Sequence, residues 1–173
     1  MGVTAFSIAC KYEEIYPPFL KDLVSITDNS FTASEILQME SEILNLLRFH
    51  LTFPTCFSFW QMISYQFKFS LIDFNYGCYL MEMYALHPNF NKYLPSLIAL
   101  AVAYIILKSK KCQRHRDLYQ LINNGNSEYD LKICAKEIYD FIEIFSSLSF
   151  KAVSRKYSSE KFNYVAINGL KWS

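Results

Sequence analysis

The stretch Ala9-Cys10-Lys11-Tyr12-Glu13-Glu14-Ile15-Tyr16-Pro17-Pro18 decides how this 173-residue chain begins to fold. Small residues at Gly2, Ala5 and Ala9 permit close approach of a neighbouring helix, and we predict a helix over residues 2–14. Pro cannot continue the backbone hydrogen-bond ladder, so Tyr16-Pro17-Pro18 ends that helix. A short helix is expected over 18–25. Two further segments matter for the argument below. Ile26-Thr27-Asp28-Asn29 is predicted to contain a turn, and Met39-Glu40 lies in the helix that follows.

Helical periodicity dominates the rest of the chain, and sustained period-two alternation is absent. Thr32-Ala33-Ser34-Glu35 is a capping box, which opens a helix running to about Leu47. A connector over 48–54 follows, and a turn is indicated at 123–127. We therefore predict an all-α fold with a polar C-terminal tail and further helices at 55–68, 73–87, 95–109, 115–123, 128–148 and 150–157.

The chain contains a weak internal repeat. A helix rich in small and apolar residues at 2–14 precedes a capped amphipathic helix at 33–47, and the same order recurs at 95–109 and 128–148. Two tandem helical modules joined near residue 50 would explain the repeat. The pattern is of low specificity by itself, because any two amphipathic helices resemble each other.

Composition excludes several classes of protein. The formal net charge is +1, which gives no electrostatic case for nucleic acid as the main partner. The longest apolar stretch, 93–107, falls short of the ~20 residues that a membrane span needs, and a buried core helix is expected instead.

The five cysteines are widely spaced and odd in number, which indicates free thiols. No His/Cys pair has metal-ligand spacing, so neither a metal nor another cofactor is expected.

Two charged residues occupy positions where apolar residues are expected. Glu40 lies four residues after Ile36 and three before Ile43, on the apolar stripe of its helix. Lys11 follows Ile8 by three in a similar position. One hypothesis is that Lys11 and Glu40 pair across adjacent helices and offer their remaining hydrogen-bonding capacity to another protein. The plainer interpretation, which periodicity alone favours, is a semi-exposed internal salt bridge or an unpaired Glu.

No catalytic pattern stands out. Glu13 and Glu14 are adjacent and so point in different directions on a helix, and Ser and Cys nucleophiles lack a His at recognisable spacing. The four glycines form no phosphate-binding loop. Basic residues gather over 108–116, where a solvated helix end is expected more often than a nucleic-acid site.

Several motifs together resemble the mitotic A/B-type cyclins, and the resemblance covers nearly the whole chain. Residues 2–18 resemble the third helix of the first cyclin box, and 27–40 the approach to its fifth. Residues 47–55 resemble the linker between the boxes. Residues 92–99 resemble the start of the central helix of the second box, and 152–166 the mitotic-cyclin tail. The resemblance implies two tandem cyclin boxes, with domains at 1–52, 53–150 and a tail at 151–173.

The resemblance also implies a function. Cyclins bind a cyclin-dependent kinase and force it into an active shape. The chain is therefore expected to be a non-catalytic regulator that forms a heterodimer with that kinase and acts at mitotic entry, in nucleus and cytoplasm. Neither a nucleic-acid partner nor a membrane partner is expected. The lysine and glutamate that hold the kinase's regulatory helix in this family match Lys11 and Glu40. The apolar kinase-facing surface carries over to Tyr12, Leu44, Phe49 and Leu51, with Tyr12 in place of the more usual Phe.

The chain departs from the family in three respects. It begins inside the first box, so the first two helices and their patch for Arg-x-Leu substrate motifs are expected to be missing, along with the destruction signal. This expectation fits either a fragment or a reduced cyclin whose uncovered apolar face a partner covers. Trp60 also stands where mitotic cyclins usually carry Leu. Two other interpretations stay open: a degenerate cyclin-fold scaffold, and a transcription-associated cyclin-box module, which should carry a basic face.

Overall fold

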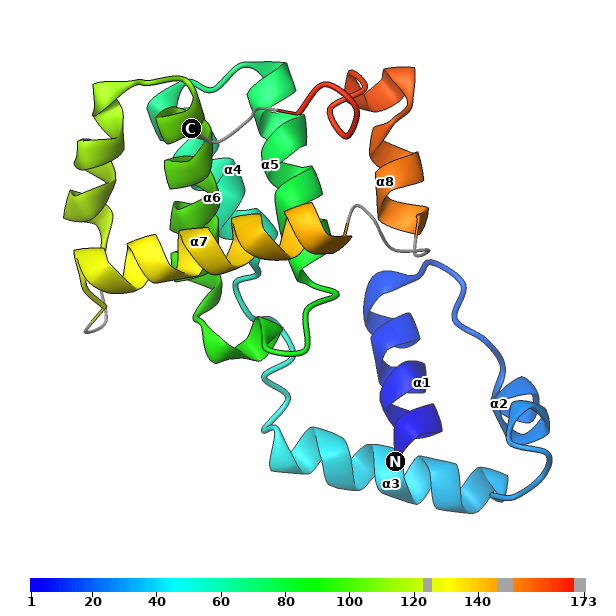
Figure 1. Cartoon of the computed structure of the whole chain (residues 1–173). Helices are drawn as coiled ribbons and strands as arrows, with labels where there is room; N and C mark the ends of the chain where they lie inside the picture. Colours follow the sequence, from blue (N-terminus) through cyan, green and yellow to red (C-terminus); the bar gives the residue numbers. More distant parts are fainter. Residues whose placement is uncertain (123–125, 146–150, 170–173) are drawn as a thin grey trace. The chain divides into compact units, whose positions relative to one another are not determined.

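The computed structural model describes residues 1–122, 126–145 and 151–169, and every regular element in these ranges is helical (Figure 1). The predicted all-α class is therefore confirmed. The chain divides into two compact units, Met1–Phe53 and Pro54–Ser173. The first contains α1 (Gly2–Glu13), α2 (Leu20–Ile26) and α3 (Ala33–Leu46). The second contains α4 (Cys56–Phe67), α5 (Leu71–Tyr84), α6 (Pro95–Ser109), α7 (Glu128–Phe145), α8 (Ala152–Tyr157) and the 3₁₀ helices η1 (Phe90–Lys92), η2 (Gln113–Leu121) and η3 (Glu160–Phe162).

The first unit is built on α3, against which α1 and α2 both pack. The predicted capping box starts α3: the Glu35 N–H donates to Thr32 Oγ1 at 3.3 Å, and the Thr32 N–H donates to Glu35 Oε2 at 2.8 Å. The hydrogen bonds from Thr32 lower the pKa of the Glu35 carboxyl. A local sequence signal thus fixes the residue at which α3, the helix that carries Glu40, begins.

The first unit, which is described in full, buries few side chains. Its buried set holds three apolar and two polar members: Ile8, Leu23, Ile36, Thr4 and Ser7. Many large apolar side chains stay exposed, among them Phe6 at 52%, Ile15 at 87% and Tyr16 at 90%. The unit therefore carries more apolar surface than it covers by itself.

The second unit is organised around α6, whose residues from Leu97 to Leu107 are all buried. Helices α4, α5, α7 and η2 pack against it. Complete enclosure explains why the sequence of α6 is apolar on every side. No helix in the described part of the chain is long and apolar enough to cross a membrane.

Segments after α7 complete the core of the second unit. Tyr157 in α8 is 2% exposed and donates its hydroxyl hydrogen to Glu82 Oε1 at 2.7 Å. Further on, the buried Asn75 donates to Asn163 Oδ1 at 2.8 Å, and Val165 is 3% exposed. The sequence prediction of a polar tail missed this packing, because two buried residues among many polar ones leave no periodic signal.

The segment predicted as a helix over 115–123 forms the 3₁₀ helix η2 instead. Cys112, His115, Leu118 and Leu121 are the buried or half-buried residues on one of its faces, and they are spaced three apart. A spacing of three matches the 3₁₀ helix, with 3.0 residues per turn, rather than the α-helix. Element η1 was not predicted. The predicted turn at 123–127 and the end of the predicted helix at 146–148 lie wholly or partly outside the described residues.

Candidate functional site

Lys11 and Glu40 form an ion pair between α1 and α3. Lys11 Nζ lies 2.6 Å from Glu40 Oε1 and 2.9 Å from Oε2. The Glu40 side chain is 13% exposed and that of Lys11 is 49% exposed. Glu40 reaches this position because it follows the buried Ile36 by one helical turn, on the face of α3 that α1 covers. The predicted pairing across adjacent helices is present in the structure.

The pair keeps unused hydrogen-bonding capacity. A lysine ammonium has three N–H donors, and Glu40 accepts two of these bonds. Each carboxylate oxygen has a second lone pair. Because half of Lys11 is exposed, the third donor can reach a carbonyl group of another protein. The arrangement therefore combines an internal salt bridge with a polar contact point at the surface.

Tyr12 connects α1 to the segment that follows α3. Its hydroxyl forms a hydrogen bond with Thr52 Oγ1, and half of the side chain is exposed. The bond brings residues 51–52 to the end of α1, next to Lys11. Sequence reasoning did not find Thr52, because the bond spans forty positions and has no local signal.

The remaining predicted site residues lie at the end of α3 and just beyond it. Leu44 follows Glu40 by four residues and is half-buried, as is Leu51, whereas Phe49 is 65% exposed. Arg48 and Phe49 both adopt left-handed backbone conformations, with φ of 50° and 57°. This reversal lets the Phe49 N–H donate to the Leu44 carbonyl at 2.9 Å. The backbone thus holds Phe49 near Leu44, at the end of α3.

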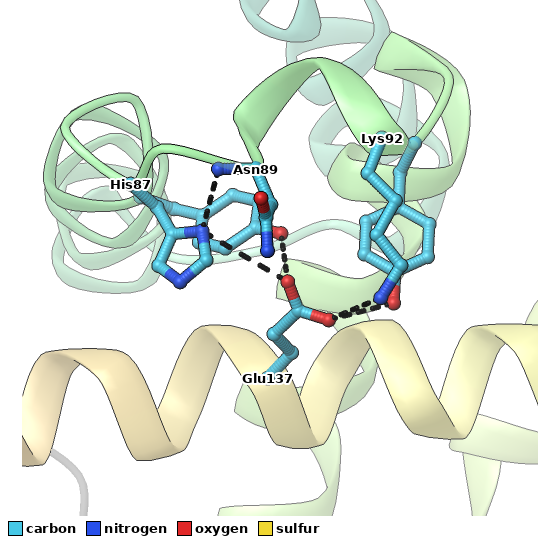
Figure 2. Close-up of polar contacts among 6 residues, drawn as sticks. His87, Asn89, Lys92 and Glu137 are labelled. Carbon is cyan, nitrogen blue, oxygen red and sulfur yellow. Dashed lines mark hydrogen bonds and ion pairs between the residues drawn. The ribbon is translucent and has the colours of Figure 1, made fainter.

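The second unit contains a polar cluster that the sequence did not reveal. Figure 2 shows Glu137 of α7 facing the connector between α5 and α6. Its carboxylate accepts hydrogen bonds from Lys92 Nζ at 2.8 Å, Tyr93 Oη at 2.9 Å and Tyr84 Oη at 3.0 Å. His87 Nδ1 accepts the Asn89 N–H at 3.0 Å and lies 3.9 Å from the carboxylate (Figure 2). The cluster fixes the connector to α7.

The hydrogen bonds in this cluster decide the charge of Glu137. Burial by itself raises the pKa of the Glu137 carboxyl, but the bonds from Lys92, Tyr93 and Tyr84 outweigh burial and lower it. The same contact raises the pKa of Lys92. Burial, reinforced by the bond to Glu137, raises the pKa of Tyr84. Glu137 is therefore a charged anchor for the connector between α5 and α6.

The described residues offer no metal centre, since no three His, Cys, Asp or Glu side chains gather closely enough to hold an ion. Glu13 and Glu14 are both exposed at the end of α1. Burial raises the pKa of the Cys56 and Cys78 thiols to about 11 and that of Cys134 to about 12. These thiols are therefore protonated and unreactive near neutral pH.

Both units match domain families of known proteins. Residues 1–52 match the cyclin N-terminal domain and residues 54–168 match the cyclin C-terminal domain. The chain belongs to the cyclin family. Cyclins are regulatory rather than catalytic proteins, and they partner with cyclin-dependent kinases. The resemblance to A- and B-type cyclins that the motifs indicated is confirmed.

Individual relatives are A- and B-type cyclins. Cyclin-B2-1 of Oryza sativa subsp. japonica is 33% identical over 171 residues, which are 96% of this chain and 40% of the relative. Putative cyclin-A3-1 of Arabidopsis thaliana is 33% identical over 174 residues, 96% of this chain and 48% of the relative. G2/mitotic-specific cyclin-B of Dictyostelium discoideum is 30% identical over 167 residues, 96% of this chain and 38% of the relative. The chain spans less than half the length of these relatives.

Proposed function

We propose that this chain binds and activates a cyclin-dependent kinase, and that Lys11, Glu40, Tyr12, Leu44, Phe49 and Leu51 form its kinase-binding surface. The observation that carries the proposal is the Lys11–Glu40 pair, whose lysine is half-exposed beside the exposed Tyr12, with Phe49 exposed just after α3. Exposed apolar groups can be buried by a partner, and charged groups with spare donors and acceptors beside them can fix the register of that partner.

The proposed mechanism is a shift in the population of kinase conformations. A protein that contacts the active arrangement of a kinase better than the inactive one stabilises the active arrangement by that difference in affinity. Burial of Tyr12, Leu44, Phe49 and Leu51 would supply most of the binding free energy. Lys11 and Glu40 would fix the register of the kinase's regulatory helix, because a misaligned helix would leave their charges unpaired in the interface.

The direct test is activation of a purified mitotic-type cyclin-dependent kinase by the chain and by three variants. Lys11→Glu and Glu40→Lys each place like charges together and are expected to lower activation at least about tenfold. The double variant Lys11→Glu/Glu40→Lys restores the internal ion pair with its direction reversed. We expect this double variant to regain thermal stability but not activation, because the kinase would then meet the wrong charge at each position.

Two results would contradict the proposal. Recovery of activation in the double variant would assign the pair a purely internal role. Kinase binding without activation by the unmodified chain would favour the cyclin-fold scaffold. Lys136→Glu in α7 is the matched control, since Lys136 is exposed and lies in the second unit. Activation by this control should stay within about twofold of the unmodified chain.

We further propose that the activity belongs to mitotic entry and that the protein occupies nucleus and cytoplasm. Support for the timing comes from the similarity to the Dictyostelium protein named G2/mitotic-specific cyclin-B. Imaging of the fluorescently tagged chain in synchronised cells, with kinase activity measured on the same cells, tests both points. Exclusion from the nucleus throughout the cycle would contradict the proposed location, and kinase stimulation confined to another phase would contradict the timing.

A further inference from the structure

The charges of this chain are unevenly distributed between its two units. The first unit has three basic and seven acidic residues, whereas the second has fourteen basic and nine acidic residues. Six of the basic residues of the second unit lie at position 68 and over 108–116, where the acidic neighbours in sequence are Asp73 and Asp117, which gives a local charge of +4. We call these six the basic cluster: Lys68, Lys108, Lys110, Lys111, Arg114 and Arg116.

Two contacts bring the parts of the basic cluster together. Arg114 Nη1 donates to the Phe67 carbonyl at 3.2 Å, and its guanidinium lies 5.0 Å from the centre of the Phe67 ring. Lys110 Nζ lies 2.6 Å from Asp73 Oδ1, a buried carboxylate that also caps the start of α5. Phe67 is the last residue of α4 and Asp73 lies in the first turn of α5, so the two contacts flank the short connector between these helices. Lys68 lies on this connector between the two anchored points, so cations distant in sequence share one end of the second unit.

Part of the basic cluster is free to bind. Lys68, Lys111 and Arg116 are exposed, and within the described residues none of them has an acidic partner. Lys110 is held by Asp73 and Arg114 by Phe67, and these contacts fix the backbone of the residues next to them. A cluster whose backbone is fixed in this way loses little conformational entropy when a ligand binds. The backbone positions of the three free cations are therefore set before a ligand binds, and the remaining cost is the ordering of their side chains.

We propose that the basic cluster is a docking surface for an acidic, Asp/Glu-rich peptide segment of another protein. A short peptide lies within the local field of +4, which extends about 8–10 Å at physiological salt. A nucleic acid is a longer polyanion, and the formal net charge of only +1 on the chain gives little electrostatic attraction for it. The balance of charge thus favours a local acidic partner. This inference is independent of the proposed kinase contact, because none of the six residues belongs to that surface.

Binding of a short fluorescein-labelled Glu-rich peptide to the full chain, followed by fluorescence anisotropy at ~0.15 M ionic strength, tests the proposal. A Gln-rich peptide of the same length is the control probe. The triple variant Lys68→Glu/Lys111→Glu/Arg116→Glu leaves the anchored Lys110 and Arg114 in place. Its affinity should fall at least about tenfold, since three attractive exposed contacts with the peptide are replaced by three repulsive ones.

A second triple variant separates local docking from general charge. Lys136→Glu/Lys151→Glu/Arg155→Glu makes the same change in net charge at exposed positions outside the basic cluster. Its affinity should stay within about twofold of the unmodified chain, with both variants keeping the unmodified helical circular-dichroism spectrum. Equal losses in the two variants, equal binding of the Gln-rich peptide, or tighter binding of single-stranded DNA through the same three residues would each overturn the proposal. Self-association of the chain that the first variant abolishes would overturn it as well, by making the occupant a second copy.

Discussion

At the scale of single residues, the chain uses partly buried carboxylates as fixed points. Glu40 joins α1 to α3 by accepting both bonds from Lys11. Glu137 and Asp73 have similar roles in the second unit, where each meets a lysine from a distant segment. In every case the carboxylate is less exposed than its lysine partner. This arrangement leaves the lysine end of each pair available to solvent or to a partner, while the carboxylate keeps the helices together.

Glu137→Gln should lower the free energy of unfolding by about 1–3 kcal/mol at neutral pH, because an amide cannot accept all three bonds that the carboxylate accepts. The stabilisation that Glu137 provides should depend on pH in a defined direction. The pKa of Glu137 is lower in the folded protein than its ordinary value of 4.5, so the folded state binds fewer protons. The stabilisation is therefore full above the unfolded pKa and is lost as pH falls through the folded pKa.

Urea unfolding of the unmodified chain and of Glu137→Gln, at neutral pH and at pH ~3, measures this difference. Asp140→Asn, three positions along α7 at an exposed site, is the matched control and should change stability little at either pH. A difference between Glu137→Gln and the unmodified chain that stays constant across the pH range would contradict the assigned charge of Glu137.

At the scale of the helices, α4 and α5 pack together where the ring of Trp60 occupies the space beside Gly77, a residue without a side chain. Trp60 is fully buried, and its Nε1–H donates to the Phe74 carbonyl at 3.1 Å. A Cβ atom at Gly77 would lie 2.2 Å from Cζ2 of that ring. The Trp60 that differs from the usual family Leu is therefore accommodated by a glycine on the facing helix, which explains how the core holds the larger ring.

Gly77→Ala should destabilise the protein by about 1–3 kcal/mol through overpacking, although the same change in an ordinary helix interior is stabilising. Combined with Trp60→Leu, the added methyl group would fill space that the indole has left. A double-mutant cycle by chemical denaturation should therefore give a favourable coupling energy of at least about 1 kcal/mol. Additive effects of the two changes would show that the ring and the glycine do not constrain each other.

At the scale of the whole molecule, the two units differ in how much apolar surface they bury. The second encloses α6 on all sides, whereas the first buries three apolar side chains and exposes many large ones. Stability rises with the apolar area removed from water, so the first unit should open more readily. An apolar surface that a unit leaves uncovered is also the surface that a partner can bury, which agrees with the kinase-binding role proposed for it.

Native-state hydrogen exchange on the full chain should show this difference directly. Amides in α6 are expected to be protected at least about a hundredfold more than amides in α1 and α3, a difference of roughly 2.7 kcal/mol in opening free energy. Binding of a kinase should protect the amides of α1 and α3 and so reduce the difference in protection between the two units. Equal protection in both units of the free chain would contradict the inference drawn from burial.

The sequence by itself determined the all-α class and the positions of most helices, and it offered the pairing of Lys11 with Glu40 as one hypothesis beside an unpaired Glu40. These features depend on local signals: Pro17-Pro18 and the Thr32–Glu35 capping box stop and start helices, and a charge on an apolar stripe requires a nearby partner. Only the tertiary structure decided the Tyr12–Thr52 bond, the Glu137 cluster, the fit of Trp60 over Gly77 and the joining of Lys68 to the cations of 108–116. Each of these contacts joins residues on separate elements or connectors, and their meeting depends on how helices cross rather than on any spacing along the chain.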